Sequence, residues 1–239
     1  MSAFSRVKLL VGQDKLQILN NSHVAVFGVG GVGGYAVEAL ARSGVGEISV
    51  FDNDTISESN LNRQIIATLD TLGKDKVEVV KDRILSINPN VKVHAHKVFY
   101  LKDNADEYPF DNFDYVIDAV DTVSAKLEVV LHAKSANVPV ISCMGTGGKT
   151  DVTALKVADI KDTKVCPLAR VMRRELRRLG VDKLKVIYSE EESIISEQDK
   201  DSAEEKSKGR IAPPSMVFVP ASAGLMLARE VVFDLIKGM

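Results

Sequence analysis

An apolar stretch from Val24 to Phe27 runs directly into a glycine-rich turn, and this junction constrains the fold more than any other part of the chain. The glycines of the turn are Gly28, Gly30, Gly31 and Gly33. A helix is expected to follow and to end near Ser43, with Gly44 as its cap. The order of strand, glycine turn and helix predicts the start of an α/β nucleotide-binding unit.

Glycine suits such a turn because it lets the backbone bend sharply and approach a phosphate closely. The free N–H groups and the positive dipole at the start of a helix then favour the anion. Asp52 ends the next expected strand, Ile48 to Phe51, where a carboxylate can accept hydrogen bonds from ribose hydroxyls. The same glycine spacing also serves NAD and FAD proteins and sometimes only close packing, so the turn alone leaves the ligand open.

Two basic residues that follow Asp52 favour a triphosphate over a dinucleotide. Arg63 lies in the segment Ser59 to Gln64, and Lys76 follows Gly73. When a triphosphate is attacked, the charge on the phosphoryl oxygens and on the departing pyrophosphate must be stabilised by Arg, Lys or a metal ion. Arg63 and Lys76 are therefore the candidate catalytic cations, and ordinary surface charges are the alternative interpretation.

A pair of carboxylates, Asp118 and Asp121, follows the apolar strand Tyr115 to Ile117. In open α/β sheets ligands bind at the carboxyl ends of the strands, and a carboxylate there can hold Mg²⁺. Asp121 is the candidate magnesium ligand. The alternative is that it caps the helix expected to open at Thr122.

Together these residues resemble the motifs of the ubiquitin-activating-type adenylating enzymes, the ThiF/MoeB/HesA superfamily, over most of the first 160 residues. The resemblance implies an enzyme that binds ATP and Mg²⁺, adenylates a carboxylate and forms a homodimer. It also implies that Arg6 acts as a catalytic arginine on the ATP of the neighbouring subunit. The implied ATP-binding residues are Gly28, Gly30, Gly31, Gly33, Asp52, Asn60, Arg63, Gln64, Lys76 and Asp121.

Within that superfamily the chain resembles most the tRNA threonylcarbamoyladenosine dehydratases. The features that carry this narrower resemblance are the start Phe4-Ser5-Arg6, the stretch Cys166 to Arg174 and the run Lys185 to Glu190. The resemblance implies ATP-dependent cyclisation of a threonylcarbamoyl group on a tRNA adenosine through a carboxyl-adenylate. A cysteine desulfurase or a sulfur-acceptor system stays open as a further partner.

An arginine-rich segment gives an independent indication of a nucleic-acid partner. Pro167 suits a helix start and Gly180 a helix end, and the basic residues between them recur at helical spacing on one face. Several arginines on one face suit phosphates, because Arg pairs with them bidentately. Glu175 is expected to lie off that face, and a solvated helix surface is the alternative. The candidate tRNA-binding residues are Arg170, Arg173, Arg174, Arg177 and Arg178.

Cysteine and histidine content bears on two alternative functions. The first is an adenylating enzyme for a ubiquitin-like sulfur-carrier protein, and the second is an NAD-binding Rossmann protein. Cys143 and Cys166 form no C-x-x-C pair, so no zinc is expected, and Cys166 is the only candidate for a reactive thiol. His94 and His96 alternate on one expected strand, but two ligands without a third are weak evidence for a metal.

The remaining pattern predicts a doubly wound, mostly parallel Rossmann-like sheet with a C-terminal α/β extension. We expect an adenylation domain over residues 1–160 and an extension over 161–239, packed on the same domain, with the arginine-rich helix and a mobile acidic loop at Ser196 to Lys208. No run of roughly 18 apolar residues occurs, so the chain is expected to be cytoplasmic and free of membrane contact.

Overall fold

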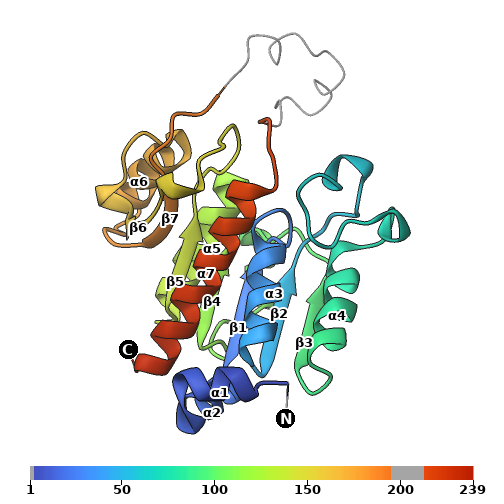
Figure 1. Ribbon diagram of the computed structural model, residues 1–239. Helices are drawn as coiled ribbons and strands as arrows, with labels where there is room; N and C mark the ends of the chain where they lie inside the picture. Colours follow the sequence, from blue (N-terminus) through green and yellow to red (C-terminus); the bar gives the residue numbers. More distant parts are fainter. Residues whose placement is uncertain (1–2, 195–212, 239) are drawn as a thin grey trace.

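The computed structural model describes residues 3–194 and 213–238, which form an α/β sandwich around a single sheet (Figure 1). The expected acidic loop at 196–208 lies outside the described residues. The strands are β1 (His23–Phe27), β2 (Glu47–Phe51), β3 (Lys92–His96), β4 (Tyr115–Asp118), β5 (Val140–Cys143), β6 (Leu155–Asp159) and β7 (Lys185–Ser189). The helices are α1 (Ser5–Val11), α2 (Gln13–Asn21), α3 (Gly33–Ser43), α4 (Lys76–Ile87), α5 (Val123–Ser135), α6 (Pro167–Arg178) and α7 (Phe218–Lys237).

The order of the strands across the sheet is β3-β2-β1-β4-β5-β7-β6. All neighbouring pairs are parallel except β6 and β7, which are antiparallel. The predicted doubly wound, mostly parallel sheet is therefore confirmed. Chain order runs outward from β1 in one direction and from β4 in the other, so these two strands flank the switch point where such sheets bind ligands.

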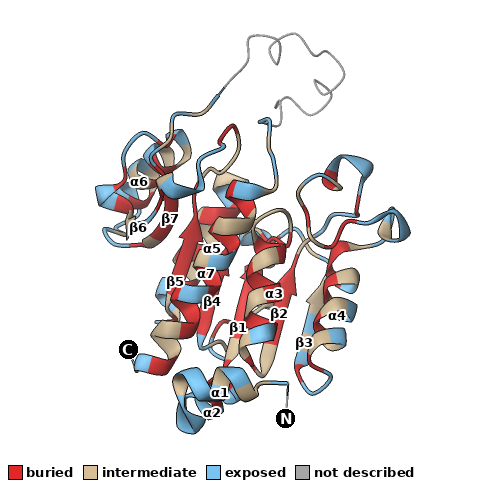
Figure 2. Cartoon of the chain, viewed as in Figure 1, coloured by how far each residue is buried: buried red, intermediate tan, exposed pale blue. Residues whose placement is uncertain are grey.

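Each face of the sheet is covered by its own apolar core, because alternate residues of a buried strand point to opposite faces. Val26 and Val50 pack with α3, α4 and α7 on one side. Phe27 and Phe51 pack with α5, α6 and the segment 97–114 on the other. Figure 2 shows the strands buried along most of the sheet between these layers. Both faces of the strands at the switch point are therefore packed against an apolar core.

Helix α7 packs closely along α3, the helix that begins at the glycine turn. A Cβ at Gly224 of α7 would lie 2.2 Å from the carbonyl oxygen of Val32, so the backbones of the two helices touch. The helix begins at Phe218, and Pro220 is tolerated there because it falls in the first turn, where no backbone N–H is needed.

Two local features were not predicted from the sequence pattern. Asp151 accepts a hydrogen bond from the Thr153 N–H and sets a short 3₁₀ turn over Val152–Ala154, so β6 begins at Leu155. The short helix α1 was not predicted, since none of its residues is buried and it shows no inward apolar stripe.

The C-terminal strands extend the main sheet, with β7 pairing to β5. In the described part of the chain no helix has the length and apolar character needed to cross a membrane.

Candidate functional site

The glycine turn packs backbone to backbone against the loop that follows β4. Gly28 has a φ of +82°, and a Cβ on it would lie 2.8 Å from the carbonyl oxygen of Ala119. A Cβ on Gly33 would lie 1.8 Å from the carbonyl oxygen of Gly28, which no real structure tolerates. These two positions therefore require glycine, and the turn is tied to the Asp118 loop across the switch point.

The predicted cationic segment lies beside the same turn. The Cβ positions of Gly30 and Gly31 would lie 3.6 Å from Nε2 of Gln64 and 3.5 Å from Cγ of Arg63. Nη1 of Arg63 donates to the carbonyl oxygen of Ser59 at 2.8 Å, which holds the guanidinium against its own loop. Arg63 is thus within the glycine turn's immediate surroundings, as its spacing in the sequence predicts.

Gln64 carries a polar atom that no described residue satisfies. Its Oε1 is buried and accepts no hydrogen bond from residues 3–194 or 213–238. A buried acceptor left unpaired costs about 1–3 kcal/mol, so such an atom indicates a position where a ligand donor completes the bonding. Asn60 is also buried, and its Oδ1 accepts from the Ser57 N–H at 3.1 Å, so part of its role is to shape the loop.

Two backbone N–H groups fix the Asp52 carboxylate beside the glycine turn. The carboxylate accepts from the N–H groups of Val29 and Asp54, each at 2.9 Å. Burial raises the pKa of Asp52, while the nearby Lys76 ammonium acts in the opposite direction. Oδ1 of Asp52 lies 3.8 Å from Nζ of Lys76, so the candidate ribose-binding carboxylate and the candidate catalytic lysine are neighbours.

Lys76 is almost completely buried at the start of α4, and its ammonium is oriented by a residue that sequence reasoning missed. Nζ lies 2.7 Å from Oδ2 of Asp54, and the Lys76 N–H donates to the Asp54 carbonyl oxygen. The available signal was the position of Asp54 two residues after Asp52, where a second carboxylate can pair with the same cation. The Lys76 ammonium is therefore held in a fixed position beside Asp52 and Asp54.

Asp118 and Asp121 have different surroundings. Asp118 is completely buried, where it pairs with Lys126 at 3.0 Å and accepts a hydrogen bond from Ser142. Burial raises the pKa of Asp118, with Lys126 and Ser142 acting against that rise. Asp121 is exposed and accepts only from the Thr122 hydroxyl among the described residues. Thr122 occupies the cap position of α5, so Asp121 is left available to a ligand.

Arg6 does not join this site within one chain. It is exposed on α1, and α1 and α2 precede the amino end of β1, whereas the glycine turn follows its carboxyl end. Figure 1 shows the two short helices at the opposite end of the sheet from that turn. A contact of Arg6 with a nucleotide would need a second subunit.

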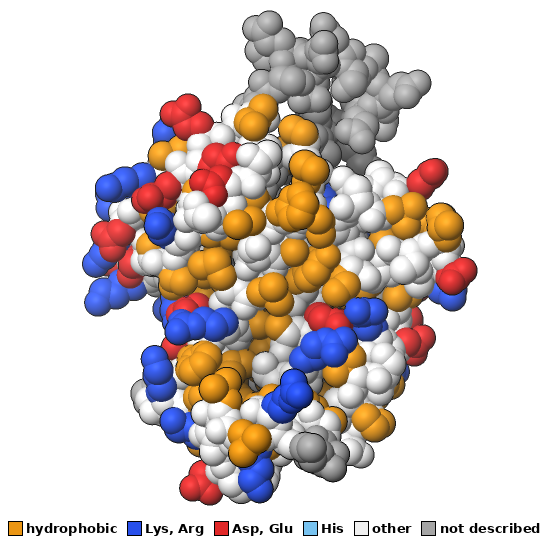
Figure 3. All heavy atoms as spheres, viewed as in Figure 1, with side chains coloured by type: hydrophobic (Ala, Val, Ile, Leu, Met, Phe, Trp, Pro, Cys, Tyr) orange, Lys and Arg blue, Asp and Glu red, His pale blue; other side chains and the backbone are white. Residues whose placement is uncertain are grey.

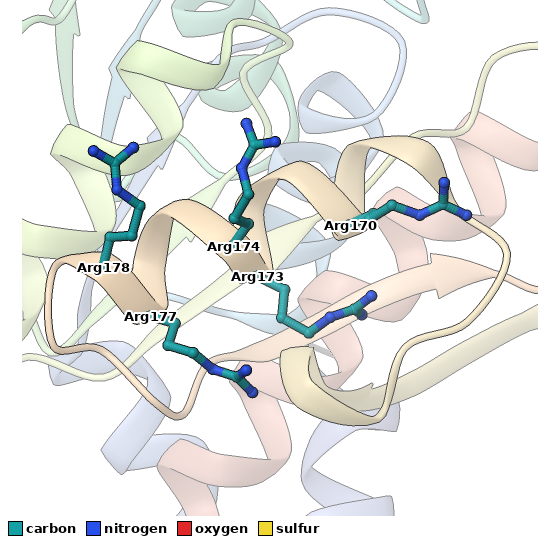
Figure 4. Close-up of a pocket in the computed structure, with 5 residues that line it drawn as sticks. All are labelled: Arg170, Arg173, Arg174, Arg177 and Arg178. Atoms are coloured by element: carbon teal, nitrogen blue, oxygen red, sulfur yellow. The ribbon is translucent and has the colours of Figure 1, made fainter.

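The arginines of α6 line an open pocket of about 520 Å³ but do not act alike. Figure 4 shows Arg173 and Arg177 pointing to one side of the helix and Arg174 and Arg178 to the other. Nη1 of Arg173 donates to the carbonyl oxygen and hydroxyl of Thr163 at 2.9 and 2.6 Å, so this side chain holds the preceding loop.

The expectation that Glu175 lies away from the arginine face is wrong. Its carboxylate pairs with Arg174 and Arg178, both at 2.8 Å. The reason is the length of the arginine side chains, because Arg174 reaches its following neighbour Glu175 and Arg178 reaches back three positions to the same carboxylate. In the described part of the chain Arg170 and Arg177 have no such partner, so they are the arginines whose charge is free to bind an anion.

Both cysteines are buried and unpaired. Burial raises the pKa of the Cys143 thiol to about 12. The Cys166 side chain lies 3.6 Å from the Cβ position of Gly145 and is only 2% exposed. Neither thiol is placed for transfer chemistry in this conformation, since a reactive cysteine must be exposed to its substrate.

Comparison with known proteins gives consistent matches. Residues 4–233 match the ThiF family. A tRNA threonylcarbamoyladenosine dehydratase from Bacillus subtilis (strain 168) is 44% identical over 240 residues, covering 98% of this chain and 94% of that protein. A protein of the same name from Escherichia coli (strain K12) is 35% identical over 207 residues, with 82% and 76% of the two chains covered.

Solved structures give the same result at the level of the fold. The structure of the E. coli tRNA N6-threonylcarbamoyladenosine dehydratase TcdA in complex with AMP superposes with a TM-score of 0.89 at 30% identity. It covers 98% of this chain and 94% of the other. The ATP complex of that protein gives a TM-score of 0.87 over the same shares.

Proposed function

Since this chain belongs to the ThiF family, we propose that it catalyses the ATP-dependent dehydration of threonylcarbamoyladenosine in tRNA. The observation that carries this proposal is the meeting of Arg63 and Lys76 with the glycine turn and Asp52, because a dinucleotide needs no such cations. Relatives named for this activity align with nearly the whole chain. The substrate carries a threonine carboxylate that ATP can activate.

The residues at the glycine turn fit ATP. Asp52 offers a fixed carboxylate to ribose hydroxyls, and the unpaired Oε1 of Gln64 fits a nucleoside hydroxyl or amino donor. The close backbone approach at Gly28 and Gly33 leaves no side chain between the start of α3 and a phosphate. The two cations, Arg63 and Lys76, are assigned to the phosphates. The glycines, Asn60 and Gln64 complete the proposed nucleotide site.

The donor set beside this site also fits magnesium. Asp121 is an exposed carboxylate at the carboxyl end of β4, and among the described residues it has no cationic partner. Mg²⁺ is commonly held by one or two carboxylates together with substrate phosphates and water. Asp121 would hold the ion, which would neutralise phosphate charge there.

We assign the chemistry to the following steps. Arg63 and Lys76 orient the triphosphate while a threonine carboxylate oxygen attacks the α-phosphorus, and the bond to pyrophosphate breaks. The resulting acyl-adenylate has an electrophilic carboxyl carbon. A nucleophilic atom of the same modified group then attacks that carbon, loses its proton and expels AMP. One carboxylate oxygen leaves with AMP, so the nucleoside loses the elements of water.

Particular residues argue against the two alternative functions. Transfer of an activated sulfur-carrier protein to a thiol is disfavoured by the burial of Cys143 and Cys166. Binding of NAD alone gives no role to Lys76, whose ammonium is held by Asp54 beside the Asp52 carboxylate. Adenylation of a carrier protein without a thioester uses the same nucleotide site, so only the substrate separates it from the proposed reaction.

Helix α6 is the proposed tRNA-binding element. Arg170 and Arg177 offer charge that no described acid neutralises, whereas Arg174 and Arg178 share Glu175 and Arg173 supports the loop at Thr163. Anions in tRNA compete with Glu175 for its two arginines. We assign the five arginines to one phosphate-binding surface in which Arg170 and Arg177 contribute most.

We also propose that the enzyme works as a homodimer in which Arg6 reaches the partner's ATP. Two observations support this. Leu9 and Leu10 on α1 are 85% and 81% exposed, and two neighbouring apolar side chains this exposed are typical of a surface that a partner covers. Figure 3 shows hydrophobic side chains gathered over α7, where Phe218 and Leu225 are exposed. A second copy would cover these surfaces.

The proposed organisation follows from these roles. Residues 1–160 supply the adenylation site, and residues 161–239 supply α6, β7 and α7 as an extension on the same sheet. Since tRNA is the proposed substrate, the proposed compartment is the cytoplasm. A cysteine desulfurase or sulfur-acceptor protein is a proposed further partner, on the family resemblance alone.

Mass spectrometry of nucleosides tests the function directly. Purified protein is incubated with tRNA that carries threonylcarbamoyladenosine and with Mg²⁺, in the presence or absence of ATP. We expect the nucleoside to lose the mass of one water only with ATP, and Arg63→Ala to abolish the loss while leaving tRNA binding near normal. An unchanged nucleoside from protein that binds ATP would overturn the proposal and favour a carrier-protein substrate.

A further inference from the structure

A second group of polar side chains lies at the other end of the sheet from the glycine turn. His23 and Glu47 are the first residues of β1 and β2, and His94 lies in the middle of β3. With about 3.3 Å per residue, the run from His23 to Phe27 separates this group from the glycine turn by about 13 Å. The nucleotide site and this group therefore do not overlap.

The three side chains converge on one carboxylate oxygen. Oε1 of Glu47 lies 2.8 Å from Nε2 of His94 and 3.6 Å from Nδ1 of His23. One ligand atom from each of the three residues lies within 4.8 Å of the others. Around a tetrahedral ion with bonds of about 2.0–2.1 Å, ligand atoms are about 3.3 Å apart. Small side-chain rotations would bring the three atoms to that spacing.

From this geometry we propose that His23, Glu47 and His94 bind a first-row divalent transition metal ion such as Zn²⁺. Two imidazoles and one carboxylate, with a fourth position left to water, are a ligand set that zinc accepts. The three residues line an open pocket of about 530 Å³, so solvent reaches that fourth position. The other oxygen of Glu47, Oε2, lies 3.5 Å from Nζ of Lys92, which leaves Oε1 as the metal-binding atom.

Neighbouring groups contact the proposed ligand residue His23 and fix its orientation, as hydrogen-bonding partners of ligands commonly do in metal sites. Nε2 of His23 lies 2.8 Å from the Ser49 hydroxyl, and when it donates there, Nδ1 keeps its lone pair on the side of Glu47. The backbone N–H of His23 donates to Oδ2 of Asp114 at 2.7 Å, which fixes the start of β1. The imidazole also meets the Phe113 ring edge to face at 4.9 Å. A ligand on a strand held in this way is preorganised.

Parallel pairing explains why the sequence could not reveal this site. In register, Glu47 lies opposite His23 and Lys92, while Ser49 lies opposite His94. The pairing thus brings together residues that are 24 to 71 positions apart in the chain. His96, which the sequence pattern groups with His94, instead stacks on Phe51 at 4.4 Å.

Metal titration of the whole protein tests the site without ATP or tRNA. Calorimetric titration of the metal-free protein with zinc chloride gives the number of zinc ions bound per chain. Competition with a chromophoric chelator, followed by absorbance, gives the zinc affinity. We expect one zinc per chain and at least about tenfold weaker binding in His94→Gln, His23→Gln and Glu47→Gln. Cobalt(II) should give the visible absorption of a tetrahedral site in the unaltered protein and not in His94→Gln.

His96→Gln is the matched control, because it removes an imidazole from the same strand and the same pocket without touching the proposed ligands. Its zinc affinity should equal that of the unaltered protein. The His94 side chain is 46% exposed, so His94→Gln should fold, and an unchanged metal-free melting temperature verifies this. Equal zinc affinity in His94→Gln and the unaltered protein, or an equal loss in His96→Gln, would overturn the proposal.

Discussion

Nζ of Lys126 lies 3.0 Å from Oδ2 of Asp118, and both side chains are completely buried beneath the loop that carries Asp121. The same ammonium donates to the carbonyl oxygen of Val120 at 2.9 Å, while Asp118 accepts from the Val120 N–H. One ion pair therefore holds Val120 from both sides. Because that loop also touches Gly28, the pair connects the proposed magnesium ligand to the glycine turn.

Replacing Lys126 by Met should leave the Asp118 carboxylate buried and unpaired. We expect the free energy of unfolding to fall by about 3–5 kcal/mol, the usual cost of removing one partner of a buried pair. Urea denaturation measures it. The double variant Asp118→Asn with Lys126→Met should recover part of the loss, and Lys134→Ala, at the exposed end of α5, should change little. A Lys126→Met protein as stable as the unaltered one would contradict this account.

Replacing Lys76 by Met should lower ATP-dependent turnover by about 100- to 1000-fold, because a fixed cation at the phosphates is lost. Lys81→Met, on the same helix, is the matched control and should keep full activity. Pyrophosphate release with modified tRNA as substrate is the measurement. Turnover that survives in Lys76→Met would exclude the proposed contact with phosphate.

Gly28→Ala and Gly73→Ala form a pair that separates backbone strain from crowding. Both glycines have positive φ, +82° and +78°, but only at Gly28 would the added Cβ meet another atom within 4 Å. Gly73→Ala should therefore cost only the left-handed penalty of about 1–2 kcal/mol. Gly28→Ala should cost more and should also weaken ATP binding. Thermal unfolding and nucleotide titration of both variants check this, and equal effects at the two positions would contradict it.

Ala at both Arg170 and Arg177 should weaken tRNA binding and make its salt dependence shallower by up to about 2 in the log–log slope. These are the α6 arginines without a partner among the described residues. Arg173→Ala should instead lower the melting temperature, because its bonds to Thr163 hold the loop before α6. Filter binding over a range of salt concentrations measures the slope. An unchanged slope in the double variant would remove α6 from the tRNA surface.

Glu38 should make the free energy of unfolding depend on pH in the acid range. Burial works to raise its pKa, but hydrogen bonds from Arg83 and Arg42 outweigh that effect and hold the pKa below its usual value. The ion pairs therefore stabilise the fold at pH values above the unfolded pKa of about 4.3, and this contribution is lost as the pH falls through the lower folded value. Glu38→Gln should flatten that part of the stability curve, and an equally steep acid dependence in the variant would contradict the prediction.

The parts of the fold that depend on local pattern were accessible from the sequence. The strand before Gly28, the helix after Gly33 and Asp52 at the end of β2 follow from glycine spacing and apolar runs, and the structure places them as predicted. The mostly parallel sheet followed from the alternation of strands and helices. These features depend on neighbours within a few residues.

Contacts across the sheet were not accessible in the same way. The bond between Lys76 and Asp54 and the burial of Lys126 depend on how separate strands and helices meet. A lysine in a sequence gives no sign that it is completely buried, since most lysines are solvated. The partners of Glu175 were missed for a related reason, because side-chain length, rather than helical angle, decides which charges meet.

The close contact of Gly224 with Val32 has a consequence for the order of folding. During synthesis, α7 leaves the ribosome only after every strand of the described sheet, yet it packs along α3, the helix that begins at the glycine turn. A nascent chain that has not yet reached residue 218 therefore leaves the surface around Tyr35 and Ala36 exposed to water and to other chains. Packing of the glycine turn and α3 is thus complete only when α7 is in place, so formation of the proposed nucleotide site depends on translation through α7.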